Sequence, residues 1–384
     1  MTEITRIGVA GTGLIGKGLA LEIEKQSNYT LSKVLTRRDI RTMSDYPFQE
    51  TLTNSVDDFL ENCDVIVECS GDVIYGTEVI DKAITASIPV ITMNAELQVT
   101  TGSYFAKRGF ITEAEGDQPG CLASLHENVV QMGFKPRVYG NIKGFLKLDP
   151  NIEDMRYWSK KNGVRLDMTT SFTDGTKVQI EQVLVANGLN AGIAVDGLLA
   201  PSSDNLNETG IELAEKANHL GYPICEFVLA PKAPPGVFIT AEHDHRQKDA
   251  LRYYKMGDGP FYTILQNYHL CHLEIMKTIK RVVDGGGILL NNGKNPSISV
   301  AAIAKRELLP GEKIAKGIGS FQVRGEAVKI AHHETHVPIG LLVNAEMKRH
   351  VKKGELLTFE DVELPKSLAL DAWVETLNTA TIKT

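Results

Sequence analysis

The first 25 residues change from a strand pattern to a helix pattern across a cluster of glycines. Residues 4–10 (ITRIGVA) are rich in β-branched side chains, and residues 17–25 (KGLALEIEK) carry apolar side chains at helical spacing. Between them stands a GxGxxG motif, and a strand, this motif and a helix in this order form the dinucleotide-binding fingerprint. Its glycines suit a tight turn, approach of the backbone to a pyrophosphate, and close packing of helix on strand. The residues expected to contact the cofactor here are Gly11, Gly13, Leu14, Ile15 and Gly16.

Strand and helix patterns continue to alternate as far as residue 97. Helical spacing at 57–63 precedes an apolar strand at 64–70, and a second helix pattern precedes a strand that begins at 89. This order predicts an α/β fold with a doubly wound parallel sheet of the Rossmann type. Ligands of such sheets bind at the carboxyl ends of the strands. We therefore expect the nicotinamide riboside to lie beside Ser70, Gly71, Asn94, Ala95 and Glu96.

The end of the second predicted strand indicates which cofactor binds. About twenty residues after the last glycine, where NAD enzymes place a carboxylate for the ribose, the chain carries Thr36, Arg37 and Arg38. Guanidinium groups suit the 2′-phosphate that distinguishes NADP from NAD. The sequence therefore favours NADP (NADPH). The alternative for the glycine motif is a glycine-rich turn that binds no ligand. The alternative for the two arginines is that they are simply solvated.

A lysine between two glycines is the first candidate for the chemistry. In GNIKGFLKLDP (residues 140–150), Asn141, Lys143 and Lys147 follow a predicted strand, and the flanking glycines let a ligand approach the backbone. A lysine here can polarise a carbonyl, protonate the alkoxide that hydride transfer creates, or hold a phosphate. We expect Lys143 to be the electrophilic residue, and Asn141 and Lys147 to contact the substrate. A solvated loop lysine is the alternative.

The segment SFTDGTKVQIEQ (residues 171–182) combines two acids and a lysine at the start of a predicted helix. Thr173 or Asp174 can cap this helix, and Lys177 and Glu181 stand four residues apart, as in an ordinary surface ion pair. An acid near the positive end of the helix dipole and a lysine open to a phosphate or a carbonyl also fit the edge of a site. Both interpretations stay open. Under the second, Lys177, Asp174 and Glu181 are catalytic candidates.

Polar turns and histidines supply further candidates. EGDQPG (residues 115–120) offers Glu115 and Asp117 before a helix that starts at its Gln-Pro pair, either as a helix cap or as a substrate-facing turn. His243 and His245 point to one side of a predicted strand and could suit a metal, but the sequence shows no third ligand. We therefore predict no metal site, keep His243 as a candidate substrate contact, and leave the need for a divalent metal open.

Composition and charge exclude several classes of protein. The 384 residues exceed the usual size of a single core, which implies two or three domains. A net charge of −7 argues against nucleic acid as a partner, because phosphates need a basic surface. The sequence has neither a signal-peptide pattern nor a run of about 20 apolar residues, so we expect no membrane contact. Five cysteines without a CxxC pair fit a reducing, cytoplasmic environment.

Several motifs resemble, in order, those of one oxidoreductase family. EGDQPG, GNIKG and SFTDGTKVQIEQ, followed by YKMGDGPFY (254–262) and YHLCHLE (268–274), resemble the 1-deoxy-D-xylulose 5-phosphate reductoisomerase-like (DRL) family. The nucleotide-binding domain of that family is similar to that of homoserine dehydrogenase. The resemblance implies a cytoplasmic, NADPH-dependent oxidoreductase that forms a homodimer or homotetramer. Some members reduce and isomerise 1-deoxy-D-xylulose 5-phosphate, but the family is wider than that activity, so the substrate stays open.

Short strand patterns separated by glycine turns mark the C-terminal region. Residues 306–314 (RELLPGEKI) and 349–357 (RHVKKGELL) share a degenerate phrase. This pattern resembles SAF-type modules, small β-rich units that also occur in sialic acid synthases, and implies a lid over the substrate or an oligomer contact. A packing module that binds no ligand is the alternative. The expected domains are a Rossmann domain at 1–140, an α+β substrate and dimerisation domain at 141–296, and a SAF-like module at 297–384.

Together these features predict an NADPH-dependent reductase of a small carbonyl substrate that is phosphorylated or otherwise anionic. Lys143 and Lys177 would hold or protonate the oxygen, and Asp174 or Glu181 would orient them. A homoserine-like amino alcohol or a sugar or polyol derivative is an alternative substrate. A protein of a different class, a sensor that binds NADP without turnover, also fits the sequence.

Overall fold

The computed structural model describes residues 4–381, and the chain forms two compact units that are each discontinuous in sequence. The first unit comprises the chain up to Cys121, His269–Asn295 and the residues from Asp371 onward. The second unit comprises Leu122–Tyr268 and Pro296–Leu370. The three predicted domains, with boundaries after residues 140 and 296, are by contrast each continuous, and they stay a prediction.

A six-stranded parallel sheet forms the centre of the first unit. Its strand order is β3-β2-β1-β4-β5-β6, and every neighbouring pair is parallel. This is the strand order of doubly wound dinucleotide-binding folds, so the predicted Rossmann-type sheet is confirmed. The strands are β1 (Thr5–Ala10), β2 (Tyr29–Leu35), β3 (Leu52–Thr53), β4 (Val65–Glu68), β5 (Val90–Thr92) and β6 (Ile111–Glu113).

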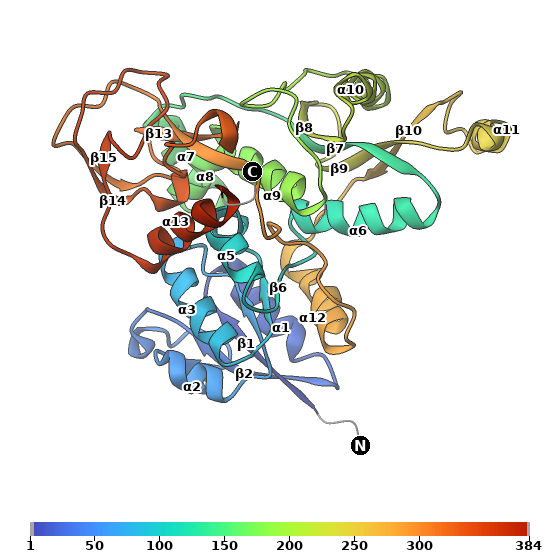
Figure 1. Ribbon diagram of the computed structural model, residues 1–384. Coiled ribbons are helices and arrows are strands. Elements are labelled where there is room, and N and C mark those ends of the chain that lie inside the picture. The colour runs from blue at the N-terminus through green and yellow to red at the C-terminus, as the bar shows by residue number, and fades with distance from the viewer. Residues whose placement is uncertain (1–3, 382–384) are drawn as a thin grey trace. The chain divides into compact units, whose positions relative to one another are not determined.

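Helices cover both faces of this sheet (Figure 1). They are α1 (Leu14–Ile23), α2 (Val56–Glu61), α3 (Val73–Thr85), α4 (Ala95–Leu97), α5 (Ser103–Ala106) and α12 (Ile275–Val283). On one face, Val9 of β1 belongs to an apolar cluster with Leu19 of α1 and Ile279 of α12. On the other face, Ile66 of β4 belongs to a cluster with Ile80 of α3. Because β4 and β5 are buried at every position, their sequences are largely continuous apolar runs rather than alternating ones.

A mixed four-stranded sheet in the order β10-β9-β7-β8 forms the centre of the second unit. The strands are β7 (Lys135–Lys143), β8 (Ile224–Leu229), β9 (Gly236–Glu242) and β10 (Phe261–Gln266), and only β7 and β8 pair in parallel. Two helices that contact it are α9 (Thr176–Gly188) and α10 (Leu206–Leu220). Val138 and Ile142 of β7 cluster with Leu213 of α10. Asn141 and Lys143 point to the other face, since side chains alternate along a strand, and there they contact α9.

Two small antiparallel sheets make up the C-terminal part of the second unit. β11 pairs with β13, while β12, β14 and β15 form a three-stranded sheet. The predicted β-rich character of this region is confirmed, whereas its assignment to the SAF type stays a prediction. The strands are β11 (Ile298–Ala304), β12 (Lys313–Lys316), β13 (Val323–Lys329), β14 (Val343–Met347) and β15 (Val362–Glu363). The remaining helices of the chain are α6 (Gln118–Gln131), α7 (Ile152–Asn162), α8 (Leu166–Thr173), α11 (Lys248–Tyr253) and α13 (Leu368–Thr381).

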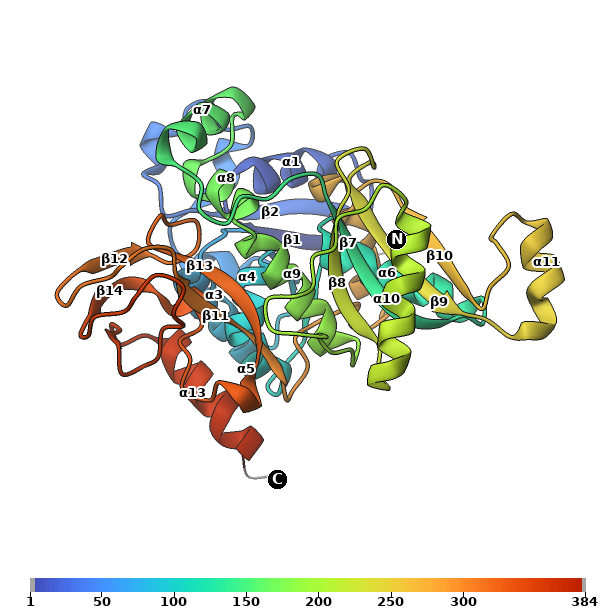
Figure 2. The same ribbon diagram turned by 90° about the horizontal axis from the view of Figure 1, so that it is seen from above.

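Helix α9 is buried on every side although many of its side chains are polar. All residues from 176 to 186 are buried, so the helix has no solvent-facing stripe. It packs against β7 and β8 on one side and against β11 and β13 on another (Figure 2). Its polar side chains satisfy backbone groups of these strands. For example, Gln182 donates hydrogen bonds to the carbonyl oxygens of Tyr139 and Glu226 at 2.8 and 2.6 Å.

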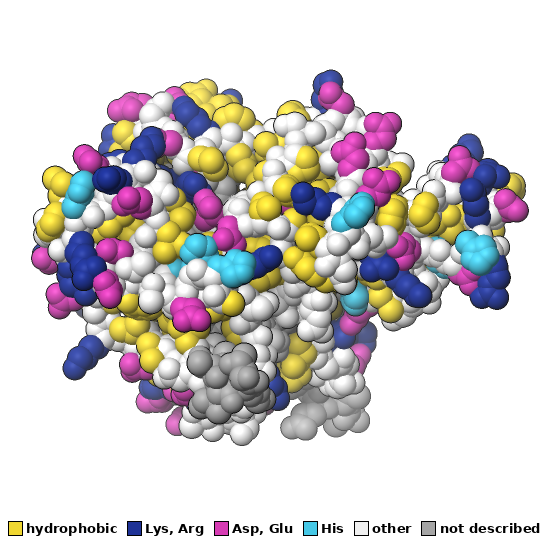
Figure 3. Space-filling view, turned by 45° about the horizontal axis from the view of Figure 1, so that its top comes forward, with side chains coloured by type: hydrophobic (Ala, Val, Ile, Leu, Met, Phe, Trp, Pro, Cys, Tyr) yellow, Lys and Arg dark blue, Asp and Glu magenta, His cyan; other side chains and the backbone are white. Residues whose placement is uncertain are grey.

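No helix within residues 4–381 is long and apolar enough to cross a bilayer. On the face drawn in Figure 3, basic side chains lie among acidic ones, in keeping with the net charge of −7.

Candidate active site

The loop between β1 and α1 has the geometry that the glycine motif predicts. Gly11 has a φ of +128°, which residues with a side chain rarely adopt. A Cβ atom on Gly16 would lie 2.0 Å from the Gly11 carbonyl oxygen, so only glycine lets α1 start this close to the loop. A Cβ atom on Gly13 would meet nothing within 4 Å. The free N–H groups of the first turn of α1, at Leu14 and Ile15, are therefore open to an anionic ligand.

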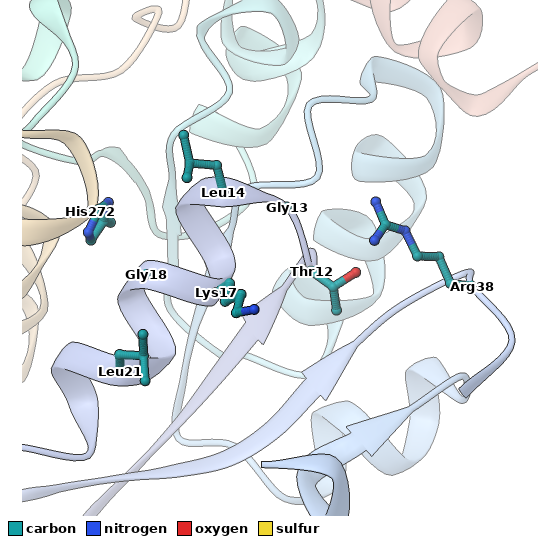
Figure 4. A pocket seen from close by; sticks show the side chains of 8 residues that line it. All are labelled: Thr12, Gly13, Leu14, Lys17, Gly18, Leu21, Arg38 and His272. Atoms are coloured by element: carbon teal, nitrogen blue, oxygen red, sulfur yellow. The ribbon is translucent and has the colours of Figure 1, made fainter. Parts of the chain in front are cut away.

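A pocket of about 460 Å³ opens beside this loop. Figure 4 shows Lys17 of α1 pointing toward Thr12, and Arg38 extending from the loop after β2. Within residues 4–381, neither the Lys17 ammonium nor the Arg38 guanidinium has an ion-pair partner, and no carboxylate lines the pocket. The lining residues are Thr12, Gly13, Leu14, Lys17, Gly18, Leu21, Arg38 and His272. Two cations without a counter-charge favour an anionic ligand at this position.

The three polar residues at the end of β2 have different environments. Thr36 is buried, and its hydroxyl oxygen lies 3.2 Å from that of Thr12. Arg37 donates a hydrogen bond to the carboxylate of Asp72 at 2.7 Å, so its charge is already compensated. Sequence reasoning missed Asp72 because it follows β4, 35 residues further along the chain. Arg38 is therefore the arginine whose charge is available to a ligand.

The carboxyl ends of β4 and β5 lie next to each other in the sheet. Glu68, the last residue of β4, is fully buried, accepts hydrogen bonds from the N–H and the hydroxyl of Ser70, and has a carboxyl pKa that burial raises. The side chain of Asn94 caps α4 by accepting a hydrogen bond from the Leu97 N–H at 3.1 Å. Of the predicted nicotinamide neighbours, Asn94 and Ala95 are buried, and those with accessible surface are Ser70, Gly71 and Glu96.

The EGDQPG turn is anchored on α12 within the first unit. The carboxylate of Glu115 pairs with the Lys277 ammonium at 2.7 Å, and its backbone N–H donates to the Thr278 hydroxyl at 2.8 Å. Asp117 accepts a hydrogen bond from the N–H of Gln118, the first residue of α6, at 3.1 Å. Asp117 thus contacts the first N–H of α6, and both the helix-cap and the substrate-contact interpretations of this turn stay predictions.

Predicted site residues from β7 and α9 meet on the face of the second unit's sheet that α9 covers. Glu181 Oε2 accepts hydrogen bonds from Asn141 Nδ2 at 2.8 Å and from Lys143 Nζ at 3.2 Å. Glu181 and Asn141 are 1% and 0% exposed, whereas the Lys143 side chain keeps 18% of its surface. Lys177, 8% exposed, stands one turn before Glu181 on the same side of α9. The Lys143 ammonium is therefore the most accessible charged group here.

Asp174 is fully buried and pairs with a lysine that sequence reasoning missed. Its Oδ2 lies 2.5 Å from Nζ of Lys305, and the two side chains are 0% and 1% exposed. The N-cap position of α9 is held by Gly175, with a φ of +86°, in place of the expected Thr173 or Asp174. Asp174 nevertheless satisfies one free N–H of the helix, that of Thr176, at 2.9 Å. A buried ion pair rather than direct substrate contact is what this geometry supports for Asp174.

The two other predicted substrate contacts, Lys147 and His243, have partners of their own. The Lys147 side chain is 47% exposed, and its ammonium lies 3.6 Å from the carboxylate of Asp154. His243 follows β9, and its Nε2 lies 3.1 Å from the carbonyl oxygen of Met132. That end of β9 pairs with the start of β7, whereas Lys143 ends the nine-residue β7, roughly 25 Å away. Substrate contact by His243 thus stays a prediction separate from the Lys143 group.

Residues 4–381 contain no group of three or more His, Cys, Asp or Glu side chains that could hold a metal ion. The ring of His243 packs edge-on against Phe134, with 4.5 Å between the ring centroids. His245 is exposed and lies in the short 3-10 helix His245–Gln247. The need for a divalent metal stays open.

Family models match both the nucleotide-binding and the catalytic parts of the chain. Residues 11–106 match the NAD-binding domain of homoserine dehydrogenase, and residues 116–275 match the catalytic domain of oxidoreductase DRL. The chain is therefore an NAD(P)-binding oxidoreductase. More specifically, it joins a DRL catalytic domain to a homoserine dehydrogenase-type NAD-binding domain, which confirms the resemblance seen in the sequence.

The solved structures that match the chain are distant in sequence. UDP-N-acetylglucosamine 3-dehydrogenase GnnA from Acidithiobacillus ferrooxidans is 12% identical, with a TM-score of 0.42 over 75% of this chain and 92% of that one. A probable dehydrogenase from Thermotoga maritima is 15% identical, with a TM-score of 0.42 over 75% and 91%. Homoserine dehydrogenase from S. aureus is 16% identical, with a TM-score of 0.25 over 35% and 43%. No curated protein matches the chain, and these structural similarities are too weak to indicate a substrate.

Proposed function

We propose that the chain transfers hydride from NADPH to the carbonyl group of a small, phosphorylated or otherwise anionic substrate. The observation that carries the proposal is the Lys143 ammonium, held by a buried carboxylate within a DRL catalytic domain. A preorganised cation stabilises a developing alkoxide most where water is largely excluded. Lys177, on the neighbouring turn of α9, adds a second positive charge for an anionic part of the substrate.

Lys143 is the proposed proton donor. The nicotinamide, when bound, supplies the hydride. Lys143 Nζ would donate a proton to the carbonyl oxygen as that oxygen gains negative charge. Glu181 would orient the amine, and Asn141 would hold Glu181 by its hydrogen bond to the same carboxylate oxygen. Lys143 thus donates the proton, Glu181 orients Lys143, and Asn141 holds Glu181.

NADPH is preferred to NADH in this proposal because of the pocket beside α1. A ribose 2′-phosphate carries about two negative charges near neutral pH. Lys17 and Arg38 line the pocket, and no carboxylate lines it. The hydroxyls of Thr12 and Thr36 are neutral donors beside them. Arg37 contributes less to the preference, because Asp72 already compensates its charge.

Single-turnover oxidation of NADPH tests the proposal. The protein is mixed with equimolar NADPH and then with a panel of phosphorylated ketoses, aldehydes and amino aldehydes, while the nicotinamide absorbance is followed. We expect at least one compound to be reduced by the wild type and by Lys25→Met, whose lysine is exposed and pairs with Glu22, but not by Lys143→Met. Tight NADPH binding without consumption by any compound would instead support a sensor that does not turn over.

A further inference from the structure

A fully buried ion pair links α9 to the C-terminal strands of the second unit. Asp174 precedes α9, and Lys305 directly follows β11. Lys305 Nζ also donates a hydrogen bond to the carbonyl oxygen of Ser320 at 2.5 Å. Two charges are costly to remove from water unless their geometry is good and their other donors and acceptors are satisfied. With 0% and 1% exposure, neither side chain can touch a substrate, so the pair can act only by holding other groups.

Further contacts follow along the side of α9 that faces β11 and β13. Thr176 Oγ1 accepts a hydrogen bond from the Gly325 N–H, and Gln179 Oε1 accepts one from the Ala327 N–H, both at 2.9 Å. Near the helix end, Asn187 donates to a carbonyl oxygen of β11 at 2.9 Å. Positions 176, 179 and 187 share one side of a helix with about 3.6 residues per turn. These contacts define the rotation of α9 about its axis and its position along that axis.

The residues with a proposed chemical role lie on a different side of the same helix. Successive residues are rotated by about 100°, which places Glu181 about 40° and Gln179 about 200° from Lys177. Whatever sets the rotation of α9 therefore also sets the distance between Glu181 and Lys143 on the fixed strand β7.

We infer that Lys305 is a positioning residue, which acts through Asp174 on the orientation of α9 and so holds Glu181 against Lys143. The inference rests on the proposed function of the Lys143–Glu181 pair. It also assigns the C-terminal strands a task in catalysis without any contact to the substrate. Lys305 would be needed for the reacting geometry rather than for binding of either reactant.

Variants of the pair separate positioning from general stability. Lys305→Met removes one charge, and the double variant Lys305→Met/Asp174→Asn removes both while it keeps an oxygen for the Thr176 N–H. Lys305→Arg keeps the charge. Lys316→Met is the matched control, because Lys316 comes from the same C-terminal strands and pairs with Asp167 at 2.6 Å, but its side chain is 40% exposed. If Lys305→Met does not fold, the double variant carries the test.

Amine labelling gives a readout that needs no substrate. Each protein is treated briefly with an N-hydroxysuccinimide ester, and the labelling of every lysine is quantified by peptide mass spectrometry. In Lys305→Met and in the double variant, we expect the labelling rate of Lys143 to change by about fivefold. The reason is that a loosened α9 no longer holds Glu181 against the Lys143 ammonium. Lys17 in the first unit is the internal reference. Unchanged labelling of Lys143 in the folded double variant would overturn the inference.

Turnover of a reducible substrate gives the second readout. We expect kcat to fall by about 10- to 100-fold in Lys305→Met and in the double variant, with the substrate KM and the NADPH Kd within about threefold of wild type. Lys305→Arg should recover most of the activity, and Lys316→Met should retain it. A double variant with the kcat of the wild type would contradict a positioning role. If no protein, wild type included, consumes NADPH, the proposed function fails, whereas the labelling experiment still decides the role of Lys305.

Discussion

Glu181 organises the candidate chemistry of the second unit from a buried position. A carboxylate with 1% exposure is stable only if its charge is compensated, and here Asn141 and Lys143 both donate to one of its oxygens. The sequence shows Glu181 as a helical partner of Lys177, four residues away. The structure adds Lys143, 38 residues away, and so makes Glu181 a link between α9 and β7.

Glu181→Gln is expected to abolish most of the activity while it leaves NADPH binding intact. The amide keeps the shape of the side chain but removes the charge that orients Lys143, and loss of one such electrostatic contact costs on the order of 100-fold in kcat. Stopped-flow kinetics with a substrate from the panel measures the effect. Glu212→Gln is the control, because Glu212 is an exposed acid of α10. A Glu181→Gln variant as active as this control would contradict the assignment.

The two arginines at the end of β2 are expected to differ in their effect on the cofactor. Arg38→Ala should weaken NADPH binding by about tenfold or more, the usual loss for one hydrogen bond to a charged group, with little effect on NADH. Arg37→Ala should have the smaller effect, since Arg37 is paired with Asp72. Fluorescence titration gives the dissociation constants. Equal losses for NADPH and NADH in Arg38→Ala would show that Arg38 does not contact a 2′-phosphate.

Glu226 of β8 should make the stability of the second unit depend on pH. It accepts hydrogen bonds from the N–H groups of Leu199 and Ala200 in the loop before α10, and burial raises its pKa from 4.5 to about 7. Between these values the folded state binds the proton more tightly than the unfolded state. The proton on Glu226 therefore contributes up to about 3 kcal/mol to the free energy of unfolding. This contribution is complete below pH 4.5 and is lost as the pH rises to about 7.

Urea unfolding at several pH values tests this contribution of Glu226. Compared with Glu226→Gln, the wild type should lose stability between pH 4.5 and 7, whereas Glu212→Gln, at an exposed acid of α10, should follow the wild type. Parallel pH profiles of the wild type and Glu226→Gln would show that Glu226 has the same proton affinity in the folded and unfolded chain.

At the scale of elements, local patterns predict the first unit well. β1 from Ile7 onward and β4 are buried on both faces and are therefore largely apolar, and the steric limits at Gly11 and Gly16 arise within one loop. The environment of α9 could not be predicted in this way. Its partners Lys305 and Gly325 stand 131 and 149 residues further along the chain from Asp174 and Thr176, and periodicity carries no information about such distant contacts.

The same reason explains the differences at the candidate site. The sequence places Lys143, Lys177 and Glu181 in motifs, but only the fold shows that β7 and α9 bring them together. It presents Arg37 and Arg38 as equivalent, because the partner of Arg37 follows a different strand. Residue types thus indicate the chemistry, whereas long-range pairing decides which of the candidates remain available to a ligand.

At the scale of the whole molecule, two compact units with separate apolar cores imply two separable responses to the cofactor. NADPH at about 100 times its Kd should stabilise the unit that binds it by about 2.7 kcal/mol. Differential scanning calorimetry should therefore show one unfolding component that shifts with NADPH and one that stays. Gly16→Ala, whose Cβ would collide with the Gly11 carbonyl oxygen, should abolish the shift. An equal shift of both components would mean that the units do not unfold independently.

The most direct test of the proposed chemistry is the transfer of deuterium from 4,4-dideuterated NADPH to a compound of the panel, followed by mass spectrometry in a single turnover. The wild type should yield an alcohol with one added deuterium at the former carbonyl carbon. Lys143→Met should bind NADPH equally well but transfer the label more slowly by about 100-fold or more, because it lacks the proton donor and the positive charge. Equal transfer by Lys143→Met, or no labelled product from any compound, would contradict the proposed chemistry.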